Sequence, residues 1–451
     1  MDMRQNINEM TRRDALKKGI AGAAGLALTQ VSRASRPRIA GKMPATQQSA
    51  QLQAKAKSVI QIWMWGGPCH IDTFDPKPDA GNDYCGPLKN PIRTNIDGIR
   101  IGELLPKLAM QADKYSILRS MTHGNNGHET ASYIVQTGHE PGQLVYPTVG
   151  AVVSRFKGYK QGYKGIVPPY IVLTQPQGRF SEAGFLGPLY KPFATGGDPN
   201  RNPFQVEGII AKGITDERQR NRRNLLGNLD SLGKFMPNNP HFKKFDEAGD
   251  KAYDLMFGEA RQLFDLTEET DELRDQYGRN TFGQSCLMAR RLVEHGVPYI
   301  TINYKGWDTH KQHFETMRRR LPEMDAGMAT LLHDLSERGL LDSTIIWWSG
   351  EFGRGPKVQW GAPWNGGRSH YGRCFSAVVA GGGFKGGHVI GKSSDKGTDV
   401  ADRPVYPEDL IGSMYALLGI DPDGPLPNPR GMDLKVMPPS EKGGGRLTEI
   451  M

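Results

Sequence analysis

The feature that most constrains the fold is an alternation of short apolar runs with longer segments of helical periodicity. The apolar runs are rich in β-branched and aromatic residues and predict buried strands. They cover residues 58–65, 114–121, 168–175, 298–304, 343–350 and 374–383. Helical spacing is clearest at residues 283–295, 324–335 and 407–418, each followed closely by a glycine. Strands that alternate with helices predict an α/β fold with a mostly parallel central sheet.

The predicted domain organisation is simple. Residues 58–451 are expected to form a single α/β domain. Residues 206–280 are polar and charged with weak helical periodicity, which predicts a helical insertion in that domain. Residues 46–57 are interpreted as a linker, because they are rich in Gln and Ala and lack an apolar pattern.

The basic leader accounts for most of the net charge. Residues 1–45 carry +6 of the total +9, so the body is nearly neutral and nucleic-acid binding is not expected. Arg12 and Arg13 precede a weakly apolar, Ala- and Gly-rich segment, which resembles a twin-arginine export signal. The alternative is a chance arginine pair on a cytosolic helix. Export would place the protein in the periplasm or cell envelope, and no apolar run predicts a membrane span in the mature chain.

Histidines and acidic residues gather where the predicted strands end. In open α/β sheets, ligands bind beyond the carboxyl ends of the strands. These segments contain His70 and Asp72, then Thr122, His123 and His128, then Asp308 and His310, then Glu351 and Arg354, and finally His370 before the last strand. Imidazole with carboxylate is the ligand set of zinc, manganese or iron. Two such ions could stabilise both oxygens of a displacement reaction.

Each segment also has an ordinary explanation. Asp72 could cap a turn, and Asp308 with His310 could form a plain loop. His123 and His128 could be polar loop residues, and Glu351 could form a salt bridge at a strand end. The joint pattern favours a metal site, because chance would not concentrate these residue types at strand ends so consistently. The four cysteines show no CxxC spacing, so a structural zinc knot is not expected.

The motifs also resemble a known family. The order GGPxHxDTFDPKP, RSMxH, GWDTH, SGEFGR and GRSHYG resembles a secreted, sulfatase-like bacterial family of unknown function, a DUF family. That family is similar to the alkaline phosphatase and sulfatase superfamily. The resemblance implies an alkaline-phosphatase-like three-layer α/β sandwich. It implies a metal pair held by Asp72, Asp308, His310, Glu351 and His370, with His70 and His128 completing the ligand set.

Two departures from the superfamily pattern matter. The usual Asp-His pair is replaced by Glu351-Phe352, and no Cys-x-Pro-x-Arg motif exists for conversion to formylglycine. A formylglycine sulfatase is therefore disfavoured. Thr122, Ser120 and Thr130, all near the second predicted strand, are candidate nucleophiles, with a metal-activated water as the alternative. Arg354 is a candidate for binding an anionic oxygen, or else a structural partner of a carboxylate. His128 is both a candidate catalytic residue and a candidate ligand.

These observations predict an exported metal-dependent hydrolase of phosphate or sulfate esters. The cofactor would be a divalent metal, zinc or manganese, with one or two ions. The substrate would be an anionic ester or a sulfated or phosphorylated glycan. The alternative is a non-catalytic, metal-containing envelope protein that binds anionic glycans or a protein partner. A cytosolic oxidoreductase is disfavoured, because no GxGxxG motif follows the first predicted strand.

Overall fold

The structure, a computed structural model, describes most of the chain beyond the leader. The described residues are 52–175, 182–207, 217, 218, 221, 225, 259–428, 430–438 and 440–451. The export signal predicted within residues 1–45 lies outside this part, as do most of the predicted insertion and the first half of the predicted linker. Among the described residues, no helix combines the length and the apolar character needed to cross a bilayer.

Eight strands form the central sheet. In spatial order they are β12 (Val389–Ile390), β4 (Tyr115–Met121), β11 (Phe375–Ala380), β8 (Thr344–Ser349), β1 (Ser58–Trp65), β7 (Tyr299–Lys305), β5 (Tyr170–Leu173) and β6 (Phe193–Ala194). All six strands predicted from the apolar runs are present. The short edge strands β6 and β12 were not predicted, because two residues carry no readable periodicity.

The sheet is buried on both faces, as its apolar sequence indicates. Val59 and Trp63 of β1 pack into one core, while Ile60, Ile62 and Met64 pack into the other. This alternation follows from the two-residue repeat of a strand. A strand with no polar face can only lie between two layers of helices.

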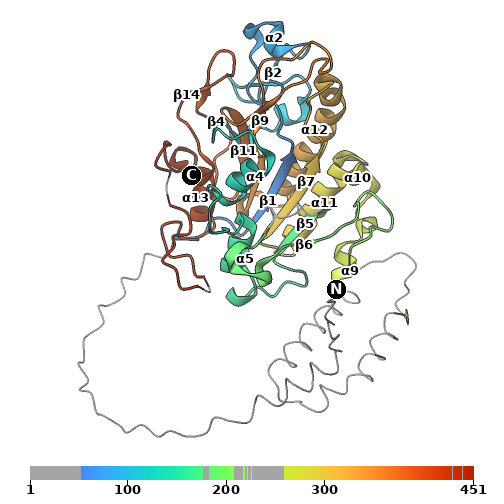
Figure 1. Ribbon diagram of the computed structural model, residues 1–451. Helices are drawn as coiled ribbons and strands as arrows, with labels where there is room; N and C mark the ends of the chain where they lie inside the picture. Colours follow the sequence, from blue (N-terminus) through green and yellow to red (C-terminus); the bar gives the residue numbers. More distant parts are fainter. Residues whose placement is uncertain are drawn as a thin grey trace, which may run out of the picture. The chain divides into compact units, whose positions relative to one another are not determined.

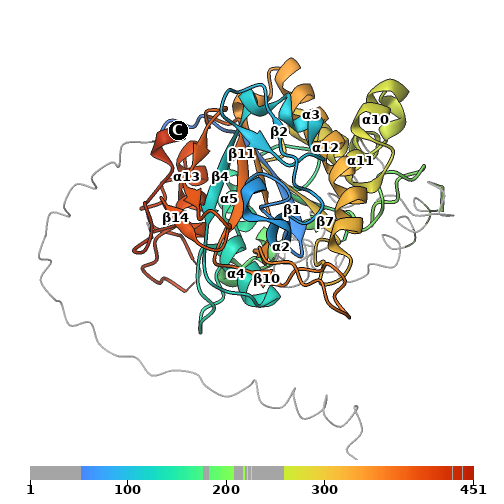
Figure 2. The ribbon, with the colours of Figure 1, turned by 90° about the horizontal axis from the view of Figure 1, so that it is seen from above.

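Helices cover both faces of the sheet (Figure 1). One layer contains α3 (Pro106–Ala109), α9 (Glu259–Leu263), α10 (Asp271–Tyr277), α11 (Thr281–Glu294) and α12 (His313–Glu337). The other contains α4 (His128–Thr137), α5 (Val149–Lys157) and α13 (Pro407–Leu417). Figure 2, a view from above, shows α11 and α12 on the opposite side of the sheet from α4 and α13. The three-layer α/β fold predicted for the chain is therefore confirmed.

Strand β11 is the exception to the parallel arrangement. It runs antiparallel to both neighbours, β4 and β8, whereas β1 is parallel to β7 and β8. Its amino end therefore lies at the same edge of the sheet as the carboxyl ends of β1, β7 and β8. Residues that precede β11 can thus meet residues that follow the other strands.

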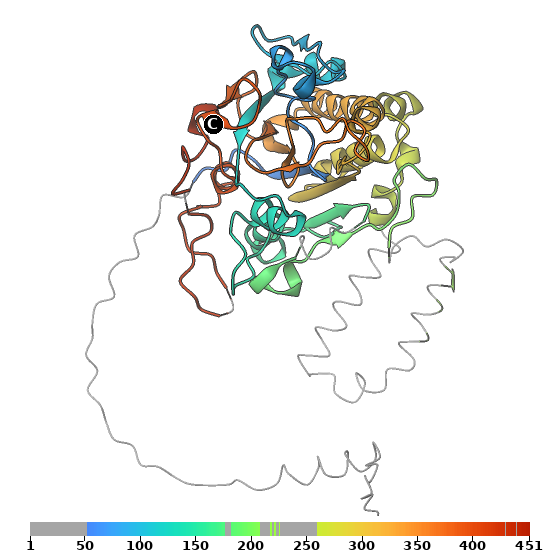
Figure 3. The same ribbon diagram turned by 45° about the horizontal axis from the view of Figure 1, so that its top comes forward.

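Short elements complete the structure around this edge and elsewhere. They are α2 (Asn82–Cys85), β2 (Ile92–Arg93), β3 (Arg100–Ile101), β9 (Gly353–Arg354), β10 (His370–Tyr371), β13 (Lys392–Ser393) and β14 (Val400–Asp402). Strands β9 and β10 form an antiparallel pair in which His370 lies opposite Arg354. Figure 3, in which the top of the sheet comes forward, shows orange loops lying across the strand ends.

Candidate metal centre

Six of the predicted site residues gather at the carboxyl edge of the sheet. Asp308 and His310 follow β7, Glu351 follows β8, and Arg354 is in β9. His128 is the first residue of α4, and His370 is in β10. Trp65 at the end of β1 pairs with Lys305 at the end of β7, so these strands end at the same level. The polar segments that follow them therefore meet.

Asp308 is the centre of this cluster. Its Oδ1 atom lies 3.0 Å from Nε2 of His370, 3.1 Å from Nε2 of His310 and 2.8 Å from a guanidinium nitrogen of Arg354. Its Oδ2 atom lies 3.3 Å from Nε2 of His128. Burial raises the pKa of Asp308, but the hydrogen bonds from His128 and His370 and the charge of Arg354 outweigh it. The pKa is held far below its usual range, so Asp308 is a carboxylate.

The orientation of His370 suits a metal ligand. Its Nδ1 atom lies 2.8 Å from the carbonyl oxygen of Asn126, which can only accept a hydrogen bond. Its Nε2 atom lies 3.0 Å from Oδ1 of Asp308, to which it can donate when no cation is bound, and 2.8 Å from Nε2 of His310. A ring whose only proton is held on Nδ1 by Asn126 presents an unprotonated Nε2 to a cation. A hydrogen bond to a backbone carbonyl is the common way to fix a metal-binding histidine. Three acceptor atoms this close together fit a cation between them.

His128 lies between two carboxylates. Its Nδ1 atom is 2.7 Å from Oε1 of Glu351, and its Nε2 atom faces Asp308. The hydrogen bonds with Asp308 and then with Glu351 raise the pKa of His128 to about 9. The ring is therefore an imidazolium when no other cation balances the two carboxylates. With a cation present, Glu351 can hold the Nδ1 proton while Nε2 acts as a ligand.

Glu351 also anchors the chain after β1. It is fully buried, and its two carboxylate oxygens accept the backbone N–H of Gly66 at 2.9 and 3.1 Å. The backbone carbonyl of Glu351 accepts a hydrogen bond from Nε2 of His123 at 2.7 Å. His123 therefore supports Glu351 and is not part of the contacts around Asp308.

A second, buried polar group lies beneath the cluster. Oδ2 of Asp72 is 2.7 Å from Nε2 of His313, and Nδ1 of His313 is 2.5 Å from the hydroxyl of Thr309. The Arg368 guanidinium pairs with Asp72 at 3.2 Å. Burial alone would raise the pKa of Asp72, but the charge of Arg368 and the hydrogen bond from His313 lower it. Asp72 is thus an ionised acceptor, so His313 donates to it and accepts from Thr309.

This buried group is better explained as a support than as a metal site. Cys69, Asp72 and His313 have ligand atoms within 4.8 Å of one another. Burial raises the pKa of the Cys69 thiol to about 12, so without a cation this group is a neutral thiol. The oxygens of Asp72 are already engaged by His313 and Arg368. A positive guanidinium in contact with Asp72 also disfavours a second cation there.

The structure does not bring every predicted residue to the cluster. His70 is buried, and its Nε2 atom lies 2.9 Å from the carbonyl oxygen of Gly397. Asp72 contacts His313 and Arg368 instead of Asp308. Thr122 lies at the end of β4, and its backbone N–H donates to Val405. Whether His70, Asp72 or Thr122 takes part in metal binding or catalysis stays a prediction.

The buried residues that support the loop carrying Asp308 were not identified from the sequence. Thr309, His313 and Arg368 were not singled out, although Thr309 lies within the GWDTH motif. One signal was present in the sequence: His313 follows Asp308 by five residues, close to a motif that was already considered. Asn126 was also missed, because its contribution comes from a backbone carbonyl, which no residue type encodes.

One family model matches almost all of the described chain. It is the family described as a protein of unknown function, DUF1501, and it matches residues 56–442. The chain belongs to this family. The resemblance to a family of unknown function is thus confirmed over most of the α/β domain. None of the curated proteins matches the sequence.

The solved structures similar to this chain include an alkaline phosphatase superfamily protein, a sulfatase and a phosphonate monoester hydrolase. An alkaline phosphatase superfamily protein from Vibrio parahaemolyticus is 11% identical with a TM-score of 0.37, covering 82% of this chain and 67% of its own. The PsFucS1 sulfatase from Pseudoalteromonas sp. is 13% identical with a TM-score of 0.35, covering 82% and 68%. A phosphonate monoester hydrolase from Silicibacter pomeroyi is 11% identical with a TM-score of 0.35, covering 81% and 73%. At these scores the likeness carries no argument about the site.

Proposed function

We propose that this protein is an exported, metal-dependent hydrolase of phosphate or sulfate esters. The observation that carries the proposal is the convergence of three imidazoles and one carboxylate at the carboxyl edge of the sheet. Such a set suits zinc or manganese. An ion held there could act as a Lewis acid on an ester oxygen and could activate a water molecule, which are two established roles of metal ions in hydrolysis.

The proposed ligands are a subset of those predicted from the sequence. Nε2 atoms of His128, His310 and His370 and the carboxylate of Asp308 would hold the ion. Burial and the charge of Arg354 lower the pKa of His310, which favours the neutral form that binds metal. Glu351 would orient His128 and not bind directly. When bound, the ion would supply Lewis acidity to the ester and to a water molecule.

Arg354 is proposed to hold Asp308 in place. Its guanidinium is fully buried and donates to Asp308 and to the backbone carbonyls of Gly66 and Arg368. Because the side chain is fully buried, Arg354 is not accessible to a substrate oxygen in this conformation. Thr122 has no contact with Asp308 among those of the described residues, so water is the preferred nucleophile.

Metal content and turnover of ligand variants test the proposal. We expect Asp308→Ala and His370→Ala to lose most of the bound zinc or manganese, measured by elemental analysis. Hydrolysis of 4-nitrophenyl phosphate and 4-nitrophenyl sulfate should fall with it. Asp342→Ala and His388→Ala change exposed residues of the same types and serve as controls. Unchanged metal content in Asp308→Ala would remove this residue from the ligand set.

A non-catalytic role is the second candidate. It is supported by the contacts of Asp308, which among the described residues include no hydroxyl or thiol that could act as a nucleophile. Such a protein would bind anionic glycans or a protein partner in the envelope. Stoichiometric metal without hydrolysis of either aryl ester, or of a wider ester panel, would favour it.

Export by the twin-arginine route is proposed from the leader alone. Arg12 and Arg13 precede an apolar segment of the type that this route accepts. Replacing both with lysine should retain the protein in the cytoplasm. Fractionation of cells that express the two forms measures this, and an equal periplasmic yield would argue against the route.

A further inference from the structure

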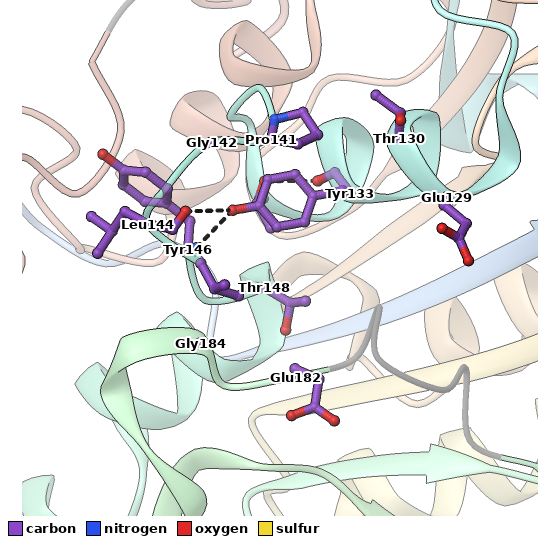
Figure 4. A pocket seen from close by; sticks show the side chains of 12 residues that line it. Glu129, Thr130, Tyr133, Pro141, Gly142, Leu144, Tyr146, Thr148, Glu182 and Gly184 are labelled. Atoms are coloured by element: carbon purple, nitrogen blue, oxygen red, sulfur yellow. Dashed lines mark hydrogen bonds between the residues drawn. The ribbon is translucent and has the colours of Figure 1, made fainter.

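A cavity of about 530 Å³ opens beside the outer face of α4 (Figure 4). Its volume lies within the range typical of small-molecule sites. The walls come from α4, the loop between α4 and α5, and the segment at residues 182–184. The lining side chains used below are Glu129, Thr130, Tyr133, Tyr146 and Glu182.

The cavity begins next to the candidate metal centre. Glu129 lines it and directly follows His128, whose ring contacts Asp308. Both residues lie in the first turn of α4, so the cavity and the cluster share the amino end of this helix. A molecule with its reacting group at Asp308 could therefore extend along α4 into this space.

The cavity lining offers no cationic side chain to an anion. None of the twelve lining residues is Lys or Arg, whereas Glu129 and Glu182 place two carboxylates on the rim. Lys191, outside the lining, pairs with Glu182 at 2.7 Å, so the rim is not strongly negative either. This balance favours an uncharged ligand over a cation. With a divalent ion bound, the cluster around Asp308 would be positive. A ligand that reaches from the cluster into the cavity would therefore pass from a positive to a nearly neutral environment.

The rest of the lining suits a ring that carries hydroxyl groups. The Tyr133 hydroxyl accepts from the N–H of Tyr146 at 2.7 Å and contacts the carbonyl of Leu144 at 3.3 Å. The Tyr146 ring stacks on His139 with centroids 3.7 Å apart. These contacts hold the aromatic wall in place before any ligand binds. Aromatic faces pack against the C–H face of a sugar ring, while carboxylates accept its hydroxyl protons.

We infer that this cavity binds the uncharged, hydroxyl-bearing alcohol portion of the ester, of the size of one or two sugar rings. The inference rests on the proposed hydrolase function and makes its substrate more specific. It predicts an ester with a single anionic group at the metal centre. A glycan with a second sulfate or phosphate on the adjoining ring would be a poor substrate, since the lining has no Lys or Arg to pair with the second anion.

Kinetics with matched esters test the inference. Glucose 6-phosphate and glucose 1,6-bisphosphate, or the corresponding 6-sulfate and 2,6-disulfate, differ by one anion. We expect the ester with one anionic group to have the lower KM. Thr130→Trp, which fills the cavity, should raise this KM about tenfold. Glu182→Gln should lower the KM of the ester with two anionic groups by about threefold. Glu140→Trp and Glu272→Gln alter exposed residues outside the lining and serve as controls.

The outcomes separate this inference from the proposed function. If aryl esters are hydrolysed but Thr130→Trp and Glu182→Gln leave both sugar esters unaffected, the cavity is not the alcohol site and the hydrolase proposal stands. If no ester is hydrolysed, binding of uncharged methyl glucopyranoside is measured by saturation-transfer NMR. A signal that Thr130→Trp abolishes supports the cavity as a sugar site. No signal, or one that Thr130→Trp leaves intact, overturns the inference.

Discussion

Thr309 lies between two candidate ligands but faces the other way. The side chains of Asp308 and His310 are 39% and 37% exposed, whereas Thr309 is 5% exposed. The N–H of Thr309 donates to the carbonyl of Trp307 at 2.9 Å, so the chain turns tightly at Asp308. The inward hydroxyl donates to His313, which is held by Asp72. The buried chain of hydrogen bonds therefore fixes the two outward ligands through the residue between them.

Removing the Thr309 hydroxyl tests this support. Thr309→Val keeps the shape but leaves Nδ1 of His313 buried without a donor, which should lower the free energy of unfolding by about 1–3 kcal/mol. We also expect weaker metal binding, measured by titration of the metal-free protein. Thr309→Ser restores the hydroxyl and should recover both. Metal affinity equal to that of the wild type in Thr309→Val would show that Thr309 does not position the ligands.

His139 gives a prediction about pH. It is partly buried beside Tyr146, and burial lowers its pKa to about 4. The unfolded chain takes up a proton at His139 near pH 6.5, while the folded protein does so only near 4. Stability from this residue is therefore complete above about pH 6.5 and is lost as the pH falls towards 4.

Replacement by phenylalanine isolates this contribution. His139→Phe keeps an aromatic ring against Tyr146 but cannot titrate. We expect urea unfolding at pH 7.5 to give similar free energies for both proteins, and a smaller loss at pH 5 for His139→Phe. Equal losses at pH 5 would contradict a lowered pKa for His139.

At the scale of elements, two strand ends are locked against each other. Gly66 follows β1 with φ +106°, and a Cβ atom there would lie 2.1 Å from the backbone nitrogen of Asp308. The N–H of Trp307 donates to the carbonyl of Trp65 at 3.1 Å. The loop that carries Asp308 therefore rests directly on backbone at the end of β1, and only glycine leaves room for it.

Gly66→Ala should displace the loop that carries Asp308. Both the positive φ and the contact with Asp308 oppose the new methyl group, so we expect a loss of stability of more than about 1 kcal/mol together with reduced metal content. Gly98→Ala is the matched control, because Gly98 has φ +80° with no atom within 4 Å of an added Cβ. Metal content equal in the two variants would show that the contact after β1 is unimportant for the site.

At the scale of the whole molecule, the cluster joins distant parts of the chain. The contact between His370 and Asn126 spans 244 positions, and that between His128 and Asp308 spans 180. A bound ion would therefore connect α4, the loop after β7 and β10. Binding to the folded state alone stabilises it by mass action.

Metal removal should thus lower the melting temperature. We expect treatment with EDTA to decrease Tm of the purified protein and added zinc or manganese to restore it, measured by calorimetry. The Asp308→Ala variant should melt at a temperature that EDTA does not change. An unchanged Tm in the wild-type protein after verified metal removal would argue against a metal that links these elements.

The sequence was enough to predict where the main strands lie and where they end, because a run of apolar residues is a local property. It was also enough to predict that polar residues at these strand ends would meet at one edge of the sheet. These residues are Asp308, His310, Glu351 and His370. The sequence could not predict which way the Asp72 side chain points, because residues in a turn after a strand show no repeating apolar pattern that would reveal their orientation. The same limit hid the buried contacts of His70.

The sequence by itself determined the α/β class, the six principal strands and the concentration of imidazoles and carboxylates at their ends, since these depend on local pattern. Only the tertiary structure decided that β11 runs antiparallel, which carries His370 to the edge where Asp308 lies. It also decided that Asp72 supports Thr309 through His313 from within the core. Strand neighbours and buried polar partners are chosen by packing across long sequence separations, and packing is a property of the folded chain.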